Sequence, residues 1–162
     1  MLQISNPQTN RFIFLVACCI SALLFSCKDS HESPIPSYYQ VYLDIDFQTP
    51  RDKDLKGIPS YQIYTEANIV KGKEMIGFGG ILVVHALNGE YKAFDLACPK
   101  ESNSSVRVHI EDDYNAVCPV CGSRFEVILN SSSGMCISGP AKYPLRYYQV
   151  IGYGSNKLIV RN

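Results

Sequence analysis

The sequence lacks tryptophan, has only three histidines and contains no run of Lys and Arg. Its 15 Lys and Arg residues balance its 15 Asp and Glu residues, so the formal net charge is zero. A protein that neutralises a row of phosphates needs clustered Lys and Arg. The GxSxG sequence of many hydrolases and the glycine-rich patterns of nucleotide sites are also missing. We therefore expect no nucleic acid or nucleotide partner, and an enzyme is the least favoured class.

One long apolar run is present, from Phe12 to Phe25, and it follows Arg11, which is the single charged side chain in residues 1–26. Its fourteen residues fall short of the roughly 20 that cross a bilayer as a helix. This anatomy is typical of a signal peptide. The run ends in the letters LFSC at Cys27, which resemble a lipobox, the sequence in which diacylglycerol is attached to the cysteine. We predict a lipoprotein signal peptide at 1–26 and a lipid anchor at Cys27; an ordinary secretory signal and an uncleaved anchor are the alternatives.

Cleavage before Cys27 would remove Cys18 and Cys19. The signal peptide and lipid anchor would place the protein in the cell envelope, and we favour the outer membrane. Residues 27–38 are polar, contain two prolines and show no periodicity, which indicates a flexible tether between the lipid and the folded domain. Disulfides form outside the cytosol, so paired cysteines need not mean metal here. The cysteines left for chemistry are Cys98, Cys118, Cys121 and Cys136.

The remaining chain, 39–162, has the pattern of a single all-β domain. Apolar and polar residues alternate from Val41 to Phe47, as in a strand with one buried face. Asn88-Gly89 separates two apolar runs and predicts a hairpin. About nine or ten short strands are expected, with no helix, and this spacing favours an antiparallel sandwich or small barrel. The expected strands are 41–47, 61–65, 81–87, 91–96, 106–110, 116–118, 124–129, 135–138, 145–153 and 158–161.

Two cysteine-containing segments carry the most specific pattern. The first is Cys98-Pro-Lys100, and the second, after seventeen residues, is Cys118-Pro-Val-Cys121 followed by Gly122-Ser123. These segments resemble the two loops of Rieske proteins, Cys-x-His and Cys-x-x-His-Gly-Ser. In that family the loops form a rubredoxin-like subdomain that holds a 2Fe–2S cluster with two thiolates on one iron and two imidazoles on the other. The segment that starts at Gly139-Pro140 is similar to the third loop, which covers the cluster.

The resemblance implies ligands that this chain has in part. Cys98 and Cys118 match the thiolate positions, but Lys100 and Cys121 stand where the two histidines should be. A Lys ammonium has no lone pair to donate, so Lys100 is expected at the surface as a non-ligand.

The other candidate ligands are not expected at the loops. His85 lies in an apolar run and is interpreted as structural. His109 is expected at the surface. Cys136 is expected as a buried thiol in the core, opposite Val127 and on the order of 15 to 20 Å from Cys121.

Three hypotheses therefore remain for Cys98, Cys118 and Cys121. The favoured one is a cluster-free binding or structural module in which two of these thiols form a disulfide between the loops. The second is electron transfer by an atypical 2Fe–2S cluster held mainly by cysteine. The third is a structural zinc site, because Cys-x-x-Cys-Gly is the shape of a metal knuckle. The expected partners are the membrane, through the diacylglyceryl anchor, and a redox or envelope protein.

Overall fold

The structure is a computed structural model, and it describes residues 33–129 and 134–162. These residues form eleven β-strands and one short 3-10 helix. The all-β prediction is therefore confirmed. The expected signal peptide, the expected lipid site at Cys27 and residues 27–32 of the expected tether lie outside the described residues. No helix in the described part of the chain has the length and apolar character needed to cross a membrane.

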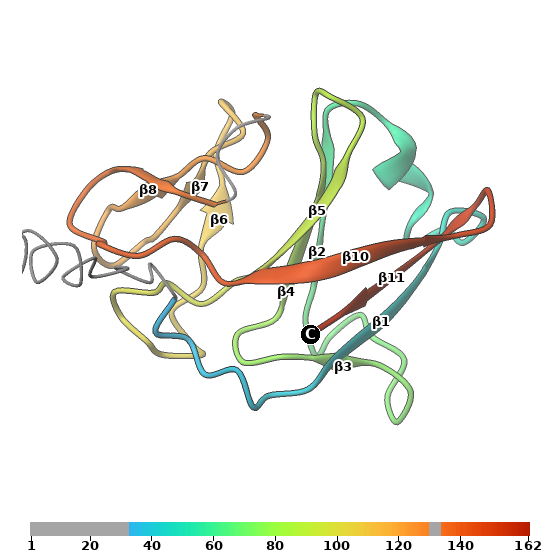
Figure 1. The fold of residues 1–162 in the computed structure, drawn as a ribbon, viewed down its shortest axis with the longest axis horizontal. Coiled ribbons are helices and arrows are strands. Elements are labelled where there is room, and N and C mark those ends of the chain that lie inside the picture. Colours follow the sequence, from blue (N-terminus) through green and yellow to red (C-terminus); the bar gives the residue numbers. More distant parts are fainter. Residues whose placement is uncertain (1–32, 130–133) are drawn as a thin grey trace, which may run out of the picture. The chain divides into compact units, whose positions relative to one another are not determined.

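Seven strands form a curled antiparallel sheet in the order β2-β4-β5-β10-β11-β1-β3 (Figure 1). Their bounds are β1 (Val41–Asp46), β2 (Ser60–Tyr64), β3 (Met75–Ile76), β4 (Ile81–His85), β5 (Tyr91–Asp95), β10 (Tyr147–Tyr153) and β11 (Lys157–Arg161). β10 pairs with β5 only through Tyr147 and Tyr148, whereas its remaining residues pair with β11. Because its two neighbours are offset along β10, the sheet curls into a half-barrel instead of lying flat.

A second, smaller sheet has the order β6-β7-β8-β9. Its strands are β6 (His109–Ile110), β7 (Ala116–Val117), β8 (Arg124–Phe125) and β9 (Cys136–Ser138). All four lie in the sequence between β5 and β10, which are neighbours in the large sheet. The small sheet is thus an insertion between two adjacent strands of the half-barrel, and Figure 1 shows it beside the β5–β10 pair. This two-sheet architecture agrees with the predicted fold class.

The β4–β5 hairpin lies between two hydrophobic cores. Every residue of β4 is buried. Alternate side chains of a strand point to opposite faces. Accordingly, Ile81 and Val83 belong to the core of the half-barrel, while Leu82 and Val84 belong to a second core that also contains Cys98 and Cys118. The predicted hairpin turn at Asn88-Gly89 is confirmed by the β4–β5 register.

Several elements differ from the sequence prediction. β3 and the 3-10 helix Lys53–Lys56 were not expected, because two residues of strand and four of helix carry no readable periodicity. β8 ends at Phe125, far short of the predicted 124–129. The strands between β5 and β10 are short, so apolar runs in that part of the sequence overestimate strand length.

The packed chain begins before the expected Tyr39. Ile35 is buried, and its carbonyl accepts a hydrogen bond from Arg146 Nη1 at 3.1 Å. The carboxamide of Asn162 donates to the carbonyl oxygens of Ser37 and Tyr39. Residues from Ile35 onwards therefore pack on the domain, which shortens the segment available as a tether.

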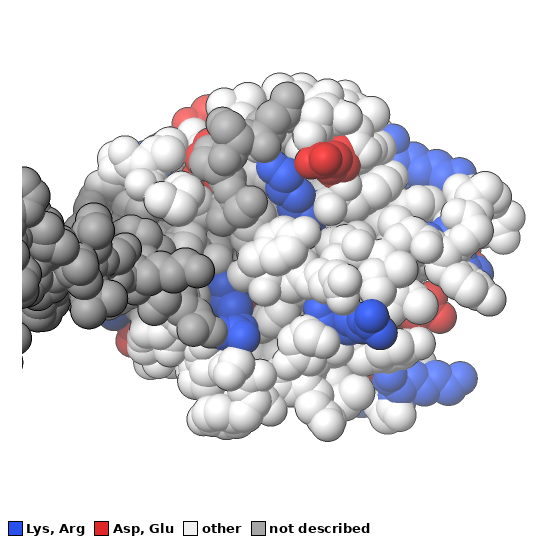
Figure 2. Space-filling view, in the orientation of Figure 1, with Lys and Arg blue, Asp and Glu red and all other residues white. Residues whose placement is uncertain are grey.

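On the face shown in Figure 2, Lys and Arg side chains are scattered among uncharged ones.

Candidate functional site

The candidate site is formed by two loops, one after β5 and one after β7. The first begins at Cys98, whose N–H donates to the Val106 carbonyl at 3.0 Å. The second is a tight turn in which the Cys118 N–H donates to the Ser123 carbonyl at 2.9 Å and the Gly122 N–H donates back to the Cys118 carbonyl at 3.0 Å. Gly122 has φ of 68°, a conformation that favours glycine and turns Cys121 back towards Cys118.

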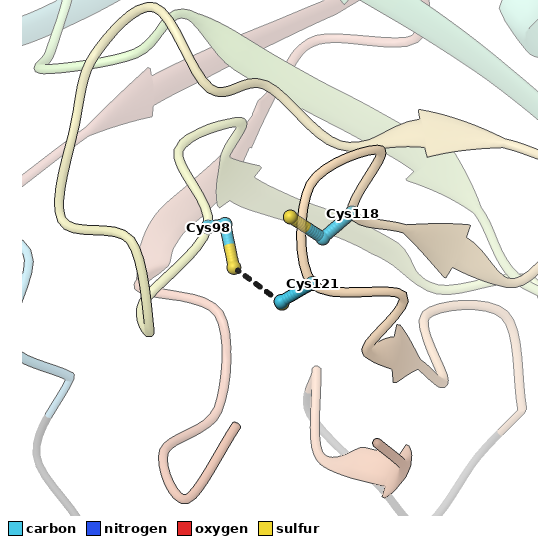
Figure 3. A group of neighbouring side chains, drawn as sticks. All are labelled: Cys98, Cys118 and Cys121. Carbon is cyan, nitrogen blue, oxygen red and sulfur yellow. Dashed lines mark hydrogen bonds between the residues drawn. The ribbon is translucent and has the colours of Figure 1, made fainter. Parts of the chain in front are cut away.

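The two loops bring three cysteine sulfurs together. The Sγ atoms of Cys98, Cys118 and Cys121 all lie within 4.8 Å of one another. Cys98 Sγ and Cys121 Sγ are 3.7 Å apart, and Figure 3 shows the side chains converging from opposite loops. A disulfide bond is about 2.05 Å long, so these thiols are unbonded in this structure. Cys98 and Cys118 are buried, whereas Cys121 is half-buried and is the most exposed of the three.

The protein environment makes these thiols unequal. Burial raises the pKa of Cys98 to about 12, although the backbone N–H groups of Glu101 and Lys100 act in the opposite direction. Burial also acts to raise the pKa of Cys121, but hydrogen bonds to the hydroxyl and the N–H of Ser123, together with those to the other two cysteines, lower it below its ordinary value. Thiolate is the form that binds metal and attacks disulfides. Cys121 therefore has a larger thiolate fraction than Cys98.

A third segment, which follows β9, packs against Ser123 of the second loop. Ser123 is fully buried, and its hydroxyl oxygen accepts the Ala141 N–H at 3.0 Å. At Gly139, where φ is 98°, an added Cβ would lie 2.6 Å from Ser123 Cα. Only glycine fits this approach. Gly139 and the Ala141 N–H therefore set the position of the segment against Ser123, two residues from Cys121, while Pro140 between them is exposed.

Asp95 holds the backbone that leads into the first loop, and we did not identify it from the sequence. Its buried carboxylate accepts N–H groups from Phe78, Gly79 and Ala97 and the hydroxyl of Tyr148 at 2.6 Å. Burial raises the pKa of Asp95, and these four donors counteract the rise. Asp95 stands three residues before Cys98, so it fixes the backbone that enters the loop. A charged residue at the end of a buried strand was the signal for it in the sequence.

The other residues considered as ligands lie elsewhere. The Lys100 side chain is 44% exposed, and its Nζ is 3.6 Å from Glu101 Oε1. His85 Nδ1 is 3.1 Å from the carbonyl oxygen of Leu55 in the half-barrel. His109 is exposed, and its Nε2 is 3.8 Å from a carboxylate oxygen of Glu111. Among the described residues, no further His, Cys, Asp or Glu joins the three-cysteine group.

Cys136 is also outside the group, but its position differs from the expected one. It pairs with Phe125, not Val127, and it is half-exposed rather than buried. Regular pairing from Arg124 and Ser138 would place Glu126 opposite Cys136, and the register shift between Arg124 and Phe125 moves the partner one residue further, to Phe125. Such irregularities leave an extra residue on one strand and are not visible in a periodic pattern.

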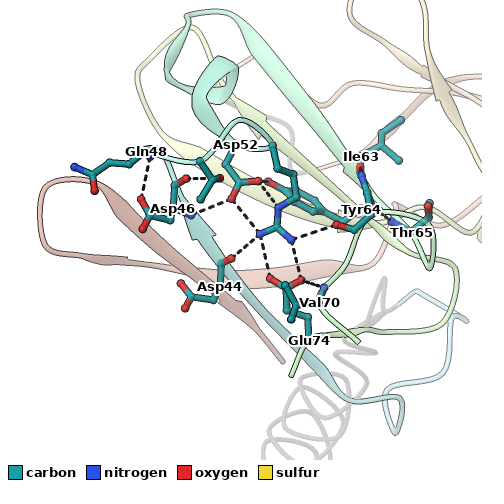
Figure 4. A network of polar contacts seen from close by, with 12 residues as sticks. Asp44, Asp46, Gln48, Asp52, Ile63, Tyr64, Thr65, Val70 and Glu74 are labelled. Atoms are coloured by element: carbon teal, nitrogen blue, oxygen red, sulfur yellow. Dashed lines mark hydrogen bonds and ion pairs between the residues drawn. The ribbon is translucent and has the colours of Figure 1, made fainter. Parts of the chain in front are cut away.

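A second polar cluster, in the half-barrel, was also missed. Arg51 donates through Nε to Asp52 Oδ1 at 2.7 Å and through Nη1 to Glu74 Oε2 at 2.8 Å, and Tyr64 donates its hydroxyl to Asp52 (Figure 4). Asp52 and Glu74 are buried. The guanidinium of Arg51 pairs with both carboxylates, so the cluster links the segment after β1 to the segment before β3.

No protein-family model, curated protein or solved structure significantly matches this chain.

Proposed function

We propose that this chain is an exported, lipid-anchored, Rieske-like domain in which Cys98, Cys118 and Cys121 bind one zinc ion instead of a 2Fe–2S cluster. The observation that carries the proposal is the convergence of three unbonded sulfurs within 4.8 Å at the junction of the loops. The role is structural, as a metal ion bound by three thiolates would tie the two loops together. The domain would then present these loops to an envelope protein.

The sulfur separation supports a single metal ion. With Zn–S distances of about 2.3 Å and tetrahedral angles, two ligand sulfurs lie about 3.8 Å apart. The observed distance between Cys98 Sγ and Cys121 Sγ is 3.7 Å. Hydrogen bonds to Ser123 lower the pKa of Cys121 and favour its thiolate form, whereas burial raises the pKa of Cys98, so metal binding would have to displace the Cys98 proton. The fourth position would be taken by water or by a group from outside the described residues.

The residues do not fit the histidine-ligated cluster of the Rieske family. Such a cluster needs four protein ligands, two on each iron. Lys100 and Cys121 occupy the imidazole positions, and neither His85 nor His109 belongs to the group. In the family arrangement Cys98 and Cys121 would bind different irons, yet their sulfurs approach to 3.7 Å. The three thiols are better matched to one ion than to two.

A disulfide between Cys98 and Cys121 is the second candidate, and their 3.7 Å approach across the loops favours it. Its formation would require the two thiols to lose two protons and two electrons to a disulfide oxidant of the envelope, which would be reduced to two thiols. Cys118 would remain as a buried free thiol. In this case the domain is a cluster-free binding module whose loops are pinned covalently.

Metal analysis of the full-length chain, isolated from membranes without oxygen, separates these candidates. We expect about one zinc per chain, no visible absorption band and three thiols protected from alkylation until a chelator is added. Two irons per chain with visible absorption would overturn the zinc proposal in favour of a cluster. A metal-free chain with a Cys98–Cys121 disulfide would overturn it in favour of the pinned module.

A matched pair of variants assigns the metal to the site. Cys121→Ser should reduce the bound zinc severalfold, because a serine hydroxyl is a poor ligand for this ion. Cys136→Ser is the control, since this half-exposed thiol lies outside the group and its Sγ donates only to the Ser138 carbonyl. Equal zinc loss in both variants would contradict the assignment.

A further inference from the structure

We infer that the side chains of Tyr38, Tyr39 and Phe78 form a membrane-contact surface that seats the domain on the lipid interface next to its anchor. The inference rests on the lipid anchor at Cys27 in the proposed function. It is independent of what the cysteines bind.

The three rings form a continuous aromatic cluster. The Tyr38 and Tyr39 rings stack with centroids 4.8 Å apart, and the Tyr39 and Phe78 centroids are 5.1 Å apart. Tyr38 is 77% exposed and Tyr39 is 39% exposed. Aromatic side chains with a polar end concentrate at membrane–water interfaces, where the ring meets acyl chains and the hydroxyl meets headgroups.

This cluster is held rigidly on the domain. The Asn162 carboxamide donates to the carbonyls of Ser37 and Tyr39 and accepts the Val41 N–H at 3.2 Å. Phe78 is fixed from the other side, because its N–H donates to Asp95 at 3.0 Å. The aromatic side chains are therefore presented by ordered backbone, so little conformational entropy would be lost when they bind a surface.

The length of the chain before the cluster places it near the bilayer. Ile35 is buried in the domain, so the tether runs only from Cys27 to Ile35. Eight residues span at most about 29 Å when fully extended, at roughly 3.6 Å per residue. Tyr38 follows three residues later, on the same segment. The anchor thus holds this end of the domain, rather than the β10–β11 turn, close to the lipid.

The chemistry of the segment favours the lipid interface itself over anionic headgroups. Residues 33–43 contain no charged side chain. In Figure 1 this segment passes below the half-barrel at the lower left. Recognition of anionic lipids requires several Lys or Arg residues together, and these are missing from the segment.

The lack of tryptophan makes a direct test possible. Tyr38→Trp introduces the only indole of the chain, and full-length lipidated protein is reconstituted in phosphatidylcholine vesicles that carry nitroxide-labelled acyl chains. Tyr153→Trp is the control: Tyr153 is 67% exposed and is the last residue of β10, and the turn between β10 and β11 lies far from residues 33–40 in Figure 1. We expect blue-shifted emission and severalfold stronger quenching for Tyr38→Trp. Equal quenching of the two variants would overturn the inference.

Flotation of the same vesicles separates failure of this inference from failure of the anchor. Protein that does not float with the vesicles lacks the anchor, which would overturn the proposed attachment and the inference with it. Protein that floats while Tyr38→Trp stays unquenched would leave the anchor intact and overturn only the membrane contact. Both substitutions replace exposed rings, and unchanged thermal unfolding confirms that the variants are folded.

Discussion

The hydroxyl oxygen of Ser123 lies 3.1 Å from Cys121 Sγ and also accepts the N–H of Ala141. One buried hydroxyl therefore connects the Cys121 thiol to the segment after β9. Removing one of these hydrogen bonds should affect the other, because water cannot reach the fully buried hydroxyl to replace the lost bond.

Ser123→Ala should raise the pKa of Cys121. Burial already acts to raise this pKa, and the variant removes the hydroxyl bond that most strongly counteracts burial. The fraction of thiolate at neutral pH then falls, and we expect severalfold slower alkylation of Cys121 in the metal-free, reduced chain. The measurement is the alkylation rate as a function of pH. Ser102→Ala, in the first loop, is the control, and an unchanged profile for Ser123→Ala would contradict the assigned role.

Gly139→Ala should destabilise the domain more than Gly154→Ala. Both glycines have positive φ, so both alanines carry backbone strain of about 1 to 2 kcal/mol. The new Cβ at position 139 would also lie 2.6 Å from Ser123 Cα, whereas nothing lies within 4 Å at position 154. Overpacking adds about 1 to 3 kcal/mol. Urea denaturation of both variants gives the difference, and equal losses would show that the close approach is unimportant.

Tyr148→Phe should cost stability in a pH-dependent way. Burial raises the pKa of Asp95, so its contribution to stability is fully present below the ordinary carboxyl pKa and is lost as pH rises through the raised value. The Tyr148 hydroxyl limits that loss by donating to the carboxylate. Without it, we expect the free energy of unfolding to fall by about 1 to 3 kcal/mol at neutral pH. The cost should be smaller in acid, where the folded carboxyl is protonated.

Denaturant unfolding at neutral pH and at about pH 4 tests this prediction. Tyr153→Phe is the matched control, because it removes a hydroxyl from an exposed ring. A cost of Tyr148→Phe that is the same at both pH values would argue that the hydroxyl does not act through the Asp95 charge.

Arg51→Lys should destabilise the half-barrel although the charge is kept. The guanidinium donates to Asp52 and Glu74 simultaneously, and a Lys ammonium cannot reproduce this fork. Leaving a buried carboxylate without its partner costs about 3 to 5 kcal/mol, and we expect a loss of roughly 2 to 3 kcal/mol since the charge remains nearby. Thermal or urea unfolding measures it. Lys157→Ala, which breaks an exposed ion pair with Asp46, should change stability by less than about 1 kcal/mol.

The sequence by itself determined the β class, the β4–β5 hairpin and the pair of cysteine loops. Each depends on residues close in the chain: alternation along one strand, an Asn-Gly turn, and the Cys118-x-x-Cys121 spacing. β3 was not predicted, because its two residues have no pattern of their own and form a strand only by pairing with β1. The predicted partner of Cys136 was wrong by two residues, and the register shift in β8 accounts for one of them.

Only the tertiary structure decided which distant groups meet. Cys98 and Cys121 are 23 residues apart, and Asp95 and Tyr148 are 53 apart, yet each pair is in contact. No local periodicity encodes these approaches, because they depend on how the small sheet is inserted between β5 and β10 and on the curl of the large sheet. The spacing of the cysteines suggested a site, and the packing of the two loops brought its third sulfur within reach of the others.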